Sequence, residues 1–213
     1  MMSYNLDYDN IRSSLSIYSS QLKELEKSRE ILIKESREVV SLCSKAIILI
    51  HSNKITDAES LLQNSFSIIN NLRTYVISDL DRYLWPAEQE YVEAIILKEI
   101  AERKSSLSGH TDLNVSLNAY VGGLLDSVGE VKRMIYDRLR KNDLQFSLSL
   151  FEIMQSIYDL LYPFSVYDNI MNGVRKKLDI SKRIIEDTRI TMTEAYQRNE
   201  FLSEFKRIAK PEP

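Results

Sequence analysis

The sequence is poor in the residues that break helices. Its 213 residues include five glycines and four prolines, and two of the prolines, Pro211 and Pro213, fall in the last three positions. Because glycine and proline are the strongest interruptions of a helix, their scarcity predicts long helices joined by short connections. No stretch of useful length alternates between apolar and polar residues, which disfavours a β-sheet.

Cysteine and histidine are almost absent as well. The single cysteine, Cys43, excludes an intrachain disulfide and fits no zinc pattern, so we expect a reducing, cytoplasmic setting. The two histidines, His51 and His110, have no partner at ligand spacing, and the Glu-x-x-His pairs of a di-iron helical protein are missing. No P-loop, GxSxG or CxxC motif occurs, so nucleotide-loop, serine-hydrolase and thiol-redox functions have no support.

The chain also lacks a long apolar run and a strong net charge. No apolar run approaches the roughly 18 residues of a membrane span, and the first residues lack a signal-peptide core, so we expect no membrane partner. The net charge of −3 argues against wholesale coating of nucleic acid. Two basic runs, KRMIYDRLRK (132–141) and RKKLDISKR (175–183), nevertheless carry five basic residues and one acid each. Such runs either form solvated helix faces or bind phosphate groups.

The apolar spacing predicts an all-α fold, a single-domain bundle of about six or seven long helices over residues 1–213. Residues 1–7 and 209–213 are expected to be flexible tails. The predicted helices cover residues 8–51, 56–80, 84–104, 115–140, 143–162 and 167–208. Thr56 and Glu59 form a capping-box pattern at the start of the second helix. The last helix is long enough that a break near Gly173 or Thr191 stays open.

The first predicted helix carries an apolar seam of about six heptads, which is too long to be buried by itself. Arg29 and Ser36 interrupt this seam. In one interpretation the helix is a coiled-coil-like arm packed on the rest of the fold. In the other, the seam opens midway, and Arg29, Lys34 and Arg37 face a ligand.

The third predicted helix places two carboxylates on one face. Glu90 and Glu93 are three residues apart in the sequence, which is about 60° around a helix. Glu93 falls within the apolar arc around Ile96 and Ile100. The residues expected in solvent lie on another arc and are Glu88, Lys98, Glu99 and Glu102. An ionised carboxylate among apolar residues needs a metal, a cation or a proton, so we expect the function to lie here.

The fourth predicted helix combines three glycines with a second acid pair. Gly122, Gly123 and Gly129 each cost a helix about 1 kcal/mol relative to alanine, so a close approach to a neighbour or a ligand must compensate. Asp126 and Glu130 are four residues apart in the sequence and share a face. Taken alone, this polar stripe is more typical of a solvated face than of a catalytic site.

Together the two acid pairs match the chemistry of a divalent metal site. Four carboxylates from two antiparallel helices can hold two Mg²⁺ or Mn²⁺ ions. Two such ions about 4 Å apart activate a water molecule and stabilise the leaving oxygen in phosphodiester cleavage. Acid pairs with this spacing are common on helices, so the spacing alone is a weak indication.

Several stretches resemble the translin/TRAX family. They are KSREILIKESREVVSLCSKAIILIH (27–51), EYVEA (90–94), GGLLDSVGEVKR (122–133) and RKKLDISKRIIEDTR (175–189). The resemblance extends from about residue 9 to residue 207, and the combination of EYVEA with DSVGE is its most specific part. It implies an all-α bundle of about seven helices. It also implies closed, hollow oligomers, up to octamers, that bind RNA or single-stranded DNA on the inner surface.

The resemblance further implies a function for the acids. The translin branch binds nucleic acid through basic residues, whereas the TRAX branch carries a metal-dependent endoribonuclease site built from Glu-x-x-Glu and Asp-x-x-x-Glu pairs. Here these pairs are Glu90 with Glu93 and Asp126 with Glu130. The chain therefore resembles the TRAX branch, in an archaeal or single-gene form without a basic nuclear-targeting extension. It is expected to cleave single-stranded or structured RNA with Mg²⁺ or Mn²⁺, and the alternative is a non-catalytic, translin-type shell that binds RNA or single-stranded DNA.

The same resemblance suggests the residues that contact RNA. They are Arg29, Lys34, Arg37, Lys45, Lys132, Arg133 and Arg140. Arginines near the acids would neutralise the charge that develops on the phosphate. The usual DLTGE of the family is DSVGE here, and Ser127 and Val128 are expected to point away from the acid face. The expected partners are RNA and further copies of the chain, from a dimer to an octamer.

Overall fold

Within the residues that the structure describes, the protein is built from helices alone. The computed structural model describes residues 7–209, and this range contains six α-helices, three short 3₁₀ segments and no strand. The α-helices are α1 (Asp9–His51), α2 (Ile55–Leu72), α3 (Trp85–Ala101), α4 (Leu117–Arg140), α5 (Leu144–Leu161) and α6 (Val174–Ala209). The 3₁₀ segments are η1 (Arg73–Tyr75), η2 (Leu80–Tyr83) and η3 (Tyr162–Tyr167). The predicted all-α fold class is therefore confirmed. The expected tails lie outside the described residues, apart from Asp7 and Ala209.

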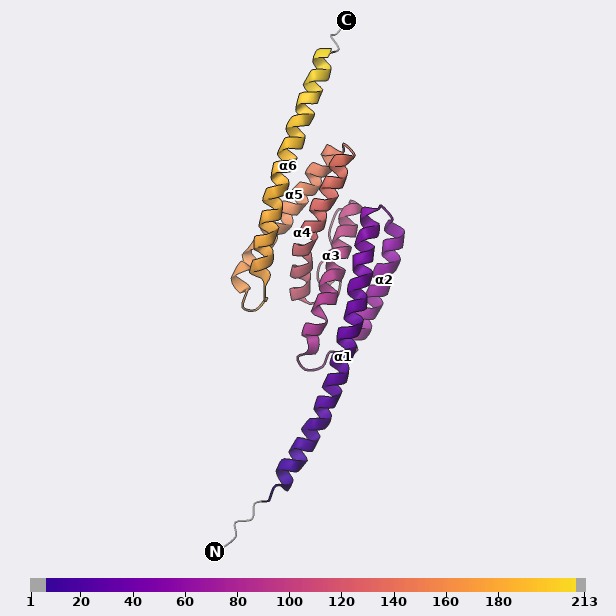
Figure 1. The fold of residues 1–213 in the computed structure, drawn as a ribbon, viewed down its shortest axis with the longest axis vertical. Helices are drawn as coiled ribbons and strands as arrows, with labels where there is room; N and C mark the ends of the chain where they lie inside the picture. The colour runs from indigo at the N-terminus through magenta and orange to yellow at the C-terminus, as the bar shows by residue number, and fades with distance from the viewer. Residues whose placement is uncertain (1–6, 210–213) are drawn as a thin grey trace.

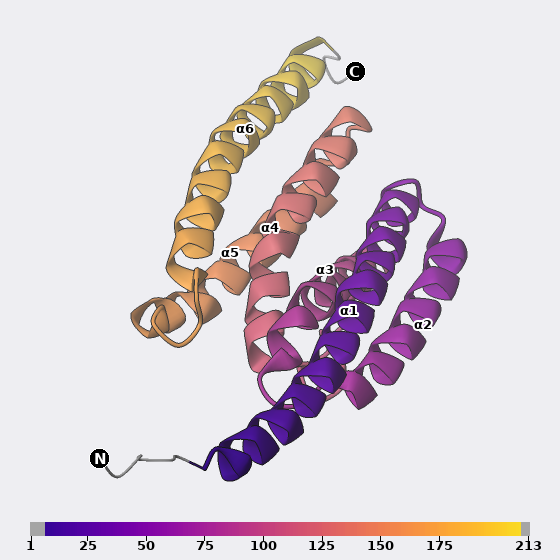
Figure 2. The ribbon, with the colours of Figure 1, turned by 60° about the horizontal axis from the view of Figure 1, so that its bottom comes forward.

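The helices follow one another in the order α2, α1, α3 and α4, and α4 packs against both α5 and α6, which also contact each other (Figure 1). α3 packs against α1 on one side and against α4 on the other, and α2 also contacts it. A second view again shows α3 between α1 and α4 (Figure 2). The first part of α1 and the last part of α6 extend beyond the bundle at opposite ends (Figure 1).

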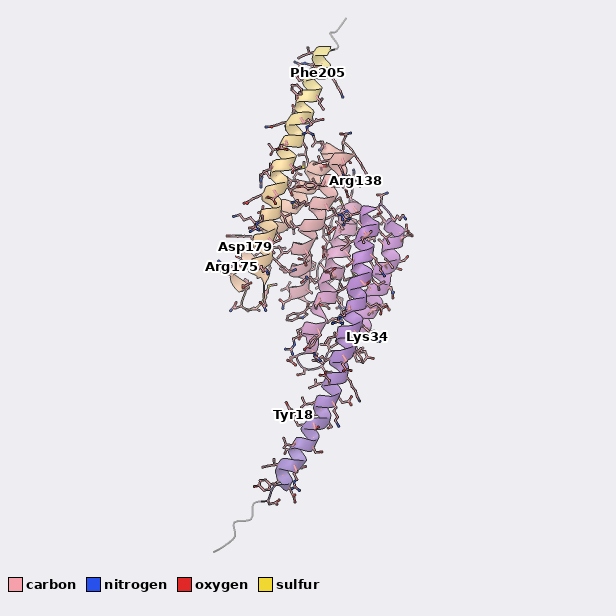
Figure 3. All side chains as sticks on the ribbon, viewed as in Figure 1. Tyr18, Lys34, Arg138, Arg175, Asp179 and Phe205 are labelled. Carbon is pink, nitrogen blue, oxygen red and sulfur yellow. The ribbon has the colours of Figure 1, made fainter. Side chains whose placement is uncertain are left out.

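The two halves of α1 have different surroundings. In the N-terminal half, the seam residues Ile11, Leu15 and Leu22 are 54%, 63% and 47% exposed, and Tyr18 lies on the part of α1 that projects from the bundle (Figure 3). From Leu32 onward the seam is buried. The interpretation of α1 as an arm packed on the rest of the fold therefore holds for its C-terminal half only.

The start and end of α2 differ from those that the sequence predicts. The helix ends at Leu72 rather than near Leu80, because the chain tightens into η1 and then η2. The predicted capping box is wrong, since Thr56 lies inside the helix and Lys54 is the N-cap, without a side-chain hydrogen bond. The helix thus begins where the preceding turn ends, which is not where the local sequence motif predicts its start.

α6 begins later than predicted and is not interrupted. Gly173 has a φ of +85°, a left-handed conformation that favours glycine, and the helix starts at the next residue, Val174. The helix continues through Thr191 to Ala209. Of the two positions where a break was left open, Gly173 therefore directly precedes the helix, and Thr191 lies within it.

Three of the four residues on the polar arc of α3 are buried, which corrects the expectation that they face solvent, whereas Glu102 is exposed as expected. Glu88, Lys98 and Glu99 are 4%, 7% and 4% exposed, because α3 lies at the centre of the bundle. Each charge has a partner: Glu88 accepts a hydrogen bond from Arg73 at 3.1 Å, and Lys98 contacts Glu59 at 2.5 Å. Glu99 accepts hydrogen bonds from the loop after α3. Buried charges are tolerated when they are paired in this way.

Two glycines bring α3 and α4 close together. A Cβ atom on Gly123 would lie 2.5 Å from the carbonyl oxygen of Gln89, and one on Gly122 would collide with the Gln89 side chain. Gly129 differs, because no atom of the described residues, apart from its chain neighbours and the nearby backbone of α4, lies within 4 Å of the place where its Cβ would be. Close packing of helices therefore explains the first two glycines, and Gly129 needs another reason.

Among residues 7–209, no helix is both long enough and apolar enough to cross a membrane. Cys43 is buried in the core between α1 and α2, where its Sγ lies 3.6 Å from the Oγ of Ser65. Burial raises the pKa of its thiol to about 12. The reducing compartment inferred from this single cysteine stays a prediction.

Candidate functional site

Four carboxylates gather where α3 faces α4. Glu90 and Glu93 come from α3, and Asp126 and Glu130 come from α4. The charges of Asp126 and Glu130 raise the pKa of both glutamates on α3, so the four groups are close enough to repel one another. We refer to Glu90, Glu93, Asp126 and Glu130 as the acid cluster.

Glu93 is the most deeply buried member of the acid cluster. Its residue is 9% exposed, and its neighbours Ile96 and Ile100 are 0% and 3% exposed. Burial, followed by the charges of Glu90, Asp126 and Glu130, raises the pKa of Glu93 to about 8. The group is therefore protonated near neutral pH unless a cation enters the cluster.

Glu90 lies at the edge of the buried region and is half-buried. Burial is the main cause that raises its pKa, and the charges of Asp126 and Glu130 add to it. The charge of Lys177 acts in the opposite direction. Both carboxyl groups of α3 thus share an environment that disfavours their ionised forms.

Asp126 is held by two donors from different helices. The Nζ of Lys177 on α6 lies 2.6 Å from both carboxylate oxygens of Asp126. The Nε2 of Gln89 on α3 donates to Oδ2 of Asp126 at 2.7 Å. One end of the acid cluster is therefore closed by a cation that belongs to the protein.

Glu130, at the other end, contacts a histidine. The Nε2 of His51, the last residue of α1, lies 2.6 Å from Oε2 of Glu130. This hydrogen bond is the main cause that lowers the pKa of Glu130. The Nδ1 of His51 is buried without a hydrogen-bond partner among the described residues, and it lies 3.8 Å from Oδ2 of Asp137.

The donor atoms of the acid cluster suit a hard divalent cation, but their present positions are not those of a metal cage. In residues 7–209, no group of three or more histidine, cysteine, aspartate or glutamate side chains is arranged to hold a metal ion. Asp126 is turned to Lys177, and Glu130 is turned to His51. The ligand set consists of carboxylates alone, as Mg²⁺ and Mn²⁺ prefer. The residues therefore fit such an ion in their chemistry and need a change of partners to bind it.

A cleft of about 870 Å³ lies next to the Glu130 end of the cluster. It is formed by residues of α1, α4 and α6, and its walls include Lys132, Arg133, Tyr136 and Arg140. Gly129 also lines the cleft, and a side chain at this position would extend into the open space. The cleft thus combines positive charge with an aromatic ring beside the carboxylates.

Similar proteins were found among solved structures. AfC3PO in complex with duplex RNA is 31% identical to this chain, with a TM-score of 0.79 over 87% of this chain and 97% of that one. A crystal structure of AfC3PO gives 31% identity and a TM-score of 0.78, over 87% and 98% of the two chains. The chain belongs to the C3PO/translin family. This membership explains the all-α fold that the sequence predicts.

Two more distant similarities were also found. The structure of apo-NeC3PO is 20% identical, with a TM-score of 0.71 over 91% of this chain and 99% of that one, and so shares the fold. The uncharacterized protein MJ0175 of Methanocaldococcus jannaschii (strain ATCC 43067 / DSM 2661 / JAL-1 / JCM 10045 / NBRC 100440) is 26% identical over 185 residues. That alignment covers 84% of this chain and 82% of the relative. No protein-family model matches the chain.

The basic residues that the sequence suggests for RNA contact fall into two groups in this C3PO/translin chain. Lys132, Arg133 and Arg140 line the cleft. The four residues of α1 are not part of its lining. Arg29 donates to the hydroxyl of Tyr83 at 3.1 Å and to Glu26 at 2.8 Å, and the side chains of Lys34, Arg37 and Lys45 are exposed.

Three residues that touch the acid cluster were not identified from the sequence. They are His51, Gln89 and Lys177. Lys177 belongs to the basic run 175–183. The sequence shows that this run is positively charged, but it does not distinguish Lys177 from its basic neighbours. His51 lies 79 positions from Glu130, so local spacing could not reveal their contact.

Proposed function

We propose that this protein is a metal-dependent endoribonuclease of TRAX-like type that uses the acid cluster to cleave RNA. The observation that carries the proposal is the burial of Glu93 beside three other carboxylates, with a pKa raised to about 8. Such an arrangement costs stability in a scaffold or a simple nucleic-acid binder, because like charges are forced together in an apolar setting. Functional sites are where this cost is commonly found.

Each acid has a role in this proposal. Glu90, Glu93, Asp126 and Glu130 would hold Mg²⁺ or Mn²⁺, which supplies a water of lowered pKa and a Lewis acid for the leaving oxygen. Glu93 is positioned rigidly because its helix is packed on several sides. His51 holds Glu130 in one orientation through a 2.6 Å contact. Such hydrogen bonds from outside the ligand set commonly fix the direction of a carboxylate.

The cleft beside Glu130 is proposed to hold the RNA strand. Lys132, Arg133 and Arg140 can contact phosphates, and Arg133 lies 3.6 Å from Glu130, so a phosphate bound there is next to the acids. Tyr136 offers a surface on which a base can stack. The complex of AfC3PO with duplex RNA supports RNA as the ligand. Structured as well as single-stranded RNA is therefore proposed as substrate.

The cleavage assay that tests this proposal compares matched variants. We expect wild-type protein with Mn²⁺ or Mg²⁺ to cleave single-stranded RNA internally, and EDTA to stop cleavage. Glu93→Gln keeps the size of the side chain but removes its charge, and we expect at least ~100-fold slower cleavage with an unchanged helical content. The control is Glu152→Gln, which changes an exposed glutamate of α5 and should leave the rate unaltered. Full activity of Glu93→Gln would remove the acid cluster from the reaction.

A non-catalytic, translin-type shell is the second candidate. The observation in its favour is that Asp126 and Glu130, two of the four acids, already have partners in Lys177 and His51 without a metal. This candidate predicts tight RNA binding with no cleavage in any divalent cation. Both candidates share the proposal that several copies of the chain assemble through the uncovered apolar residues of α1 and α6. A cytoplasmic location is proposed with either.

A further inference from the structure

We propose that Lys177 is a built-in counter-cation of the acid cluster, which occupies Asp126 until a divalent ion displaces it. This inference rests on the proposed metal-dependent function and adds a residue that controls how tightly the ion binds. It makes metal binding an exchange of one cation for another, rather than the filling of a free site.

The contacts of Asp126 show what Lys177 blocks. Its Nζ is 2.6 Å from Oδ1 and 2.6 Å from Oδ2, and Gln89 donates to Oδ2 as well. A carboxylate offers about four lone-pair directions for hydrogen bonds or metal ions. The three contacts of Asp126 already use most of these directions. Bidentate or bridging coordination of a metal by Asp126 therefore requires that the ammonium group leaves.

The backbone of Lys177 is fixed by the packed face of α6. Leu178 is 3% exposed, and the Oγ of Ser181, which is 1% exposed, donates to the carbonyl oxygen of Leu125 on α4 at 3.3 Å. The start of α6 is set by the left-handed conformation of Gly173. The helix thus places the ammonium group of Lys177 at Asp126. Only the flexible side chain of Lys177 has to move when a divalent ion replaces it.

Lys177 differs from the other cations of its run. In residues 175–183 the remaining basic residues are exposed, and they are Arg175, Lys176, Lys182 and Arg183. Figure 3 places Arg175 on the outer side of α6, away from α4. The side chain of Lys177 is 30% exposed and points to the acids. A solvated helix face explains four of these cations but does not explain Lys177.

The charge of Lys177 also reaches the rest of the cluster. The pKa values of Glu90 and Glu93 are raised mainly by burial and by the other acids, and the charge of Lys177 acts against this increase in both cases. Its ammonium group thus does part of what a divalent ion would do. A second positive charge in the same place would be repelled, so the two cations exclude each other.

A small cavity of about 80 Å³ beside Lys177 gives the exchange a spectroscopic reporter. Its walls include Gln89, Lys177 and Trp85, and Trp85 is the single tryptophan of the chain. A movement of Lys177 therefore changes the surroundings of Trp85. We expect a change in intrinsic fluorescence when Mg²⁺ binds to the wild-type protein.

The test measures Mn²⁺ binding to the full-length chain, by electron paramagnetic resonance of the free ion, in parallel with Mg²⁺-dependent Trp85 fluorescence. Lys177→Met removes the ammonium group and keeps much of the side-chain volume. Lys177→Gln is a second variant that can still donate to Asp126, in case the first does not fold. Lys176→Met, at an exposed position next in the chain, is the matched control. Circular dichroism checks that all variants are folded.

We expect the Kd for Mn²⁺ to fall about tenfold or more in both Lys177 variants and to stay unchanged in Lys176→Met. An equal or weaker affinity in the Lys177 variants, with Mn²⁺ binding to the wild type intact, overturns the inference and leaves the proposed nuclease standing. If none of the proteins binds Mn²⁺, the metal-dependent function itself is wrong, and the inference fails with it.

Discussion

Glu93 shows how the chemistry of a single residue depends on what surrounds it. On its own helix it lies among apolar residues, and in the folded protein α4 adds two further acids to Glu90. Burial is the largest of these effects on its pKa. A carboxyl group in this position can take up a proton or share a metal ion, and near neutral pH the two compete.

The raised pKa of Glu93 leads to a prediction about stability without metal. The folded-state pKa of about 8 lies above the ordinary value of 4.5, so the folded protein retains a proton that the unfolded chain releases. Stability from this group is therefore full below about pH 4.5 and decreases as the pH rises to about 8, by at most ~5 kcal/mol. Glu93→Gln cannot lose this proton. In EDTA, its melting temperature should exceed that of the wild type by an amount that grows from about pH 5 to about pH 8.

The control for this measurement is Glu152→Gln, whose difference from the wild type should not change with pH, because the residue is exposed. Addition of Mn²⁺ near pH 8 should stabilise the wild type and reduce its difference from Glu93→Gln. A difference that stays constant across this pH range would contradict the raised pKa.

At the scale of elements, two glycines of α4 serve different purposes. Gly123 allows the backbone of α4 to touch that of α3, whereas Gly129 lines the cleft and has open space around it. The first therefore sets the distance between the helices that carry the acids. The second keeps a side chain out of the region where RNA is proposed to lie.

Alanine substitutions at these glycines should have opposite effects on stability. Gly123→Ala forces a Cβ to 2.5 Å from the carbonyl oxygen of Gln89 and to 2.7 Å from Cβ of Val92, and we expect a loss of ~1–3 kcal/mol or more. Gly129→Ala meets nothing and improves the helix, so a gain of up to ~1 kcal/mol is expected. Denaturant unfolding followed by circular dichroism measures both. Equal destabilisation by the two variants would mean that the close approach of α3 and α4 is not where the structure has it.

Local periodicity predicted some of these features and not others. The position of Glu93 in an apolar arc and the sharing of a face by Asp126 and Glu130 follow from 3.6 residues per turn alone. The burial of Glu88, Lys98 and Glu99 could not be predicted in this way, because a projection of one helix does not show that neighbours cover it on several sides. The contacts of His51 and Lys177 join helices that are distant in the sequence, and only the tertiary fold brings them to the acids.

At the scale of the whole molecule, the projecting parts of α1 and α6 leave apolar side chains uncovered. The first part of α1 exposes Leu15 and Leu22, and the last part of α6 exposes Phe205, which Figure 3 shows near the far end of the molecule. Scattered apolar residues on a surface are ordinary, but a seam in regular heptad spacing is typical of a helix that packs against another. These arms are proposed to join copies of the chain.

Charge placed on the seam should therefore change the oligomeric state and leave the bundle intact. We expect Leu15→Asp with Leu22→Asp to reduce the mass measured by light scattering, ideally to that of a single chain, with an unchanged melting of the helices. Ser13→Asp with Ser20→Asp adds the same charge on the opposite face of α1 and is the matched control. An unchanged mass in the seam variant would place the contacts between copies elsewhere.

The acid cluster is the centre of the proposed function, and the position of a bound ion tests it most directly. The measurement is anomalous diffraction from crystals soaked in Mn²⁺, with data collected near the manganese absorption edge. The proposed function predicts an anomalous peak between α3 and α4 that contacts Glu93 and Asp126, with the Nζ of Lys177 moved from its 2.6 Å contacts. The absence of any peak there at saturating Mn²⁺, with Lys177 still bound to Asp126, would contradict it.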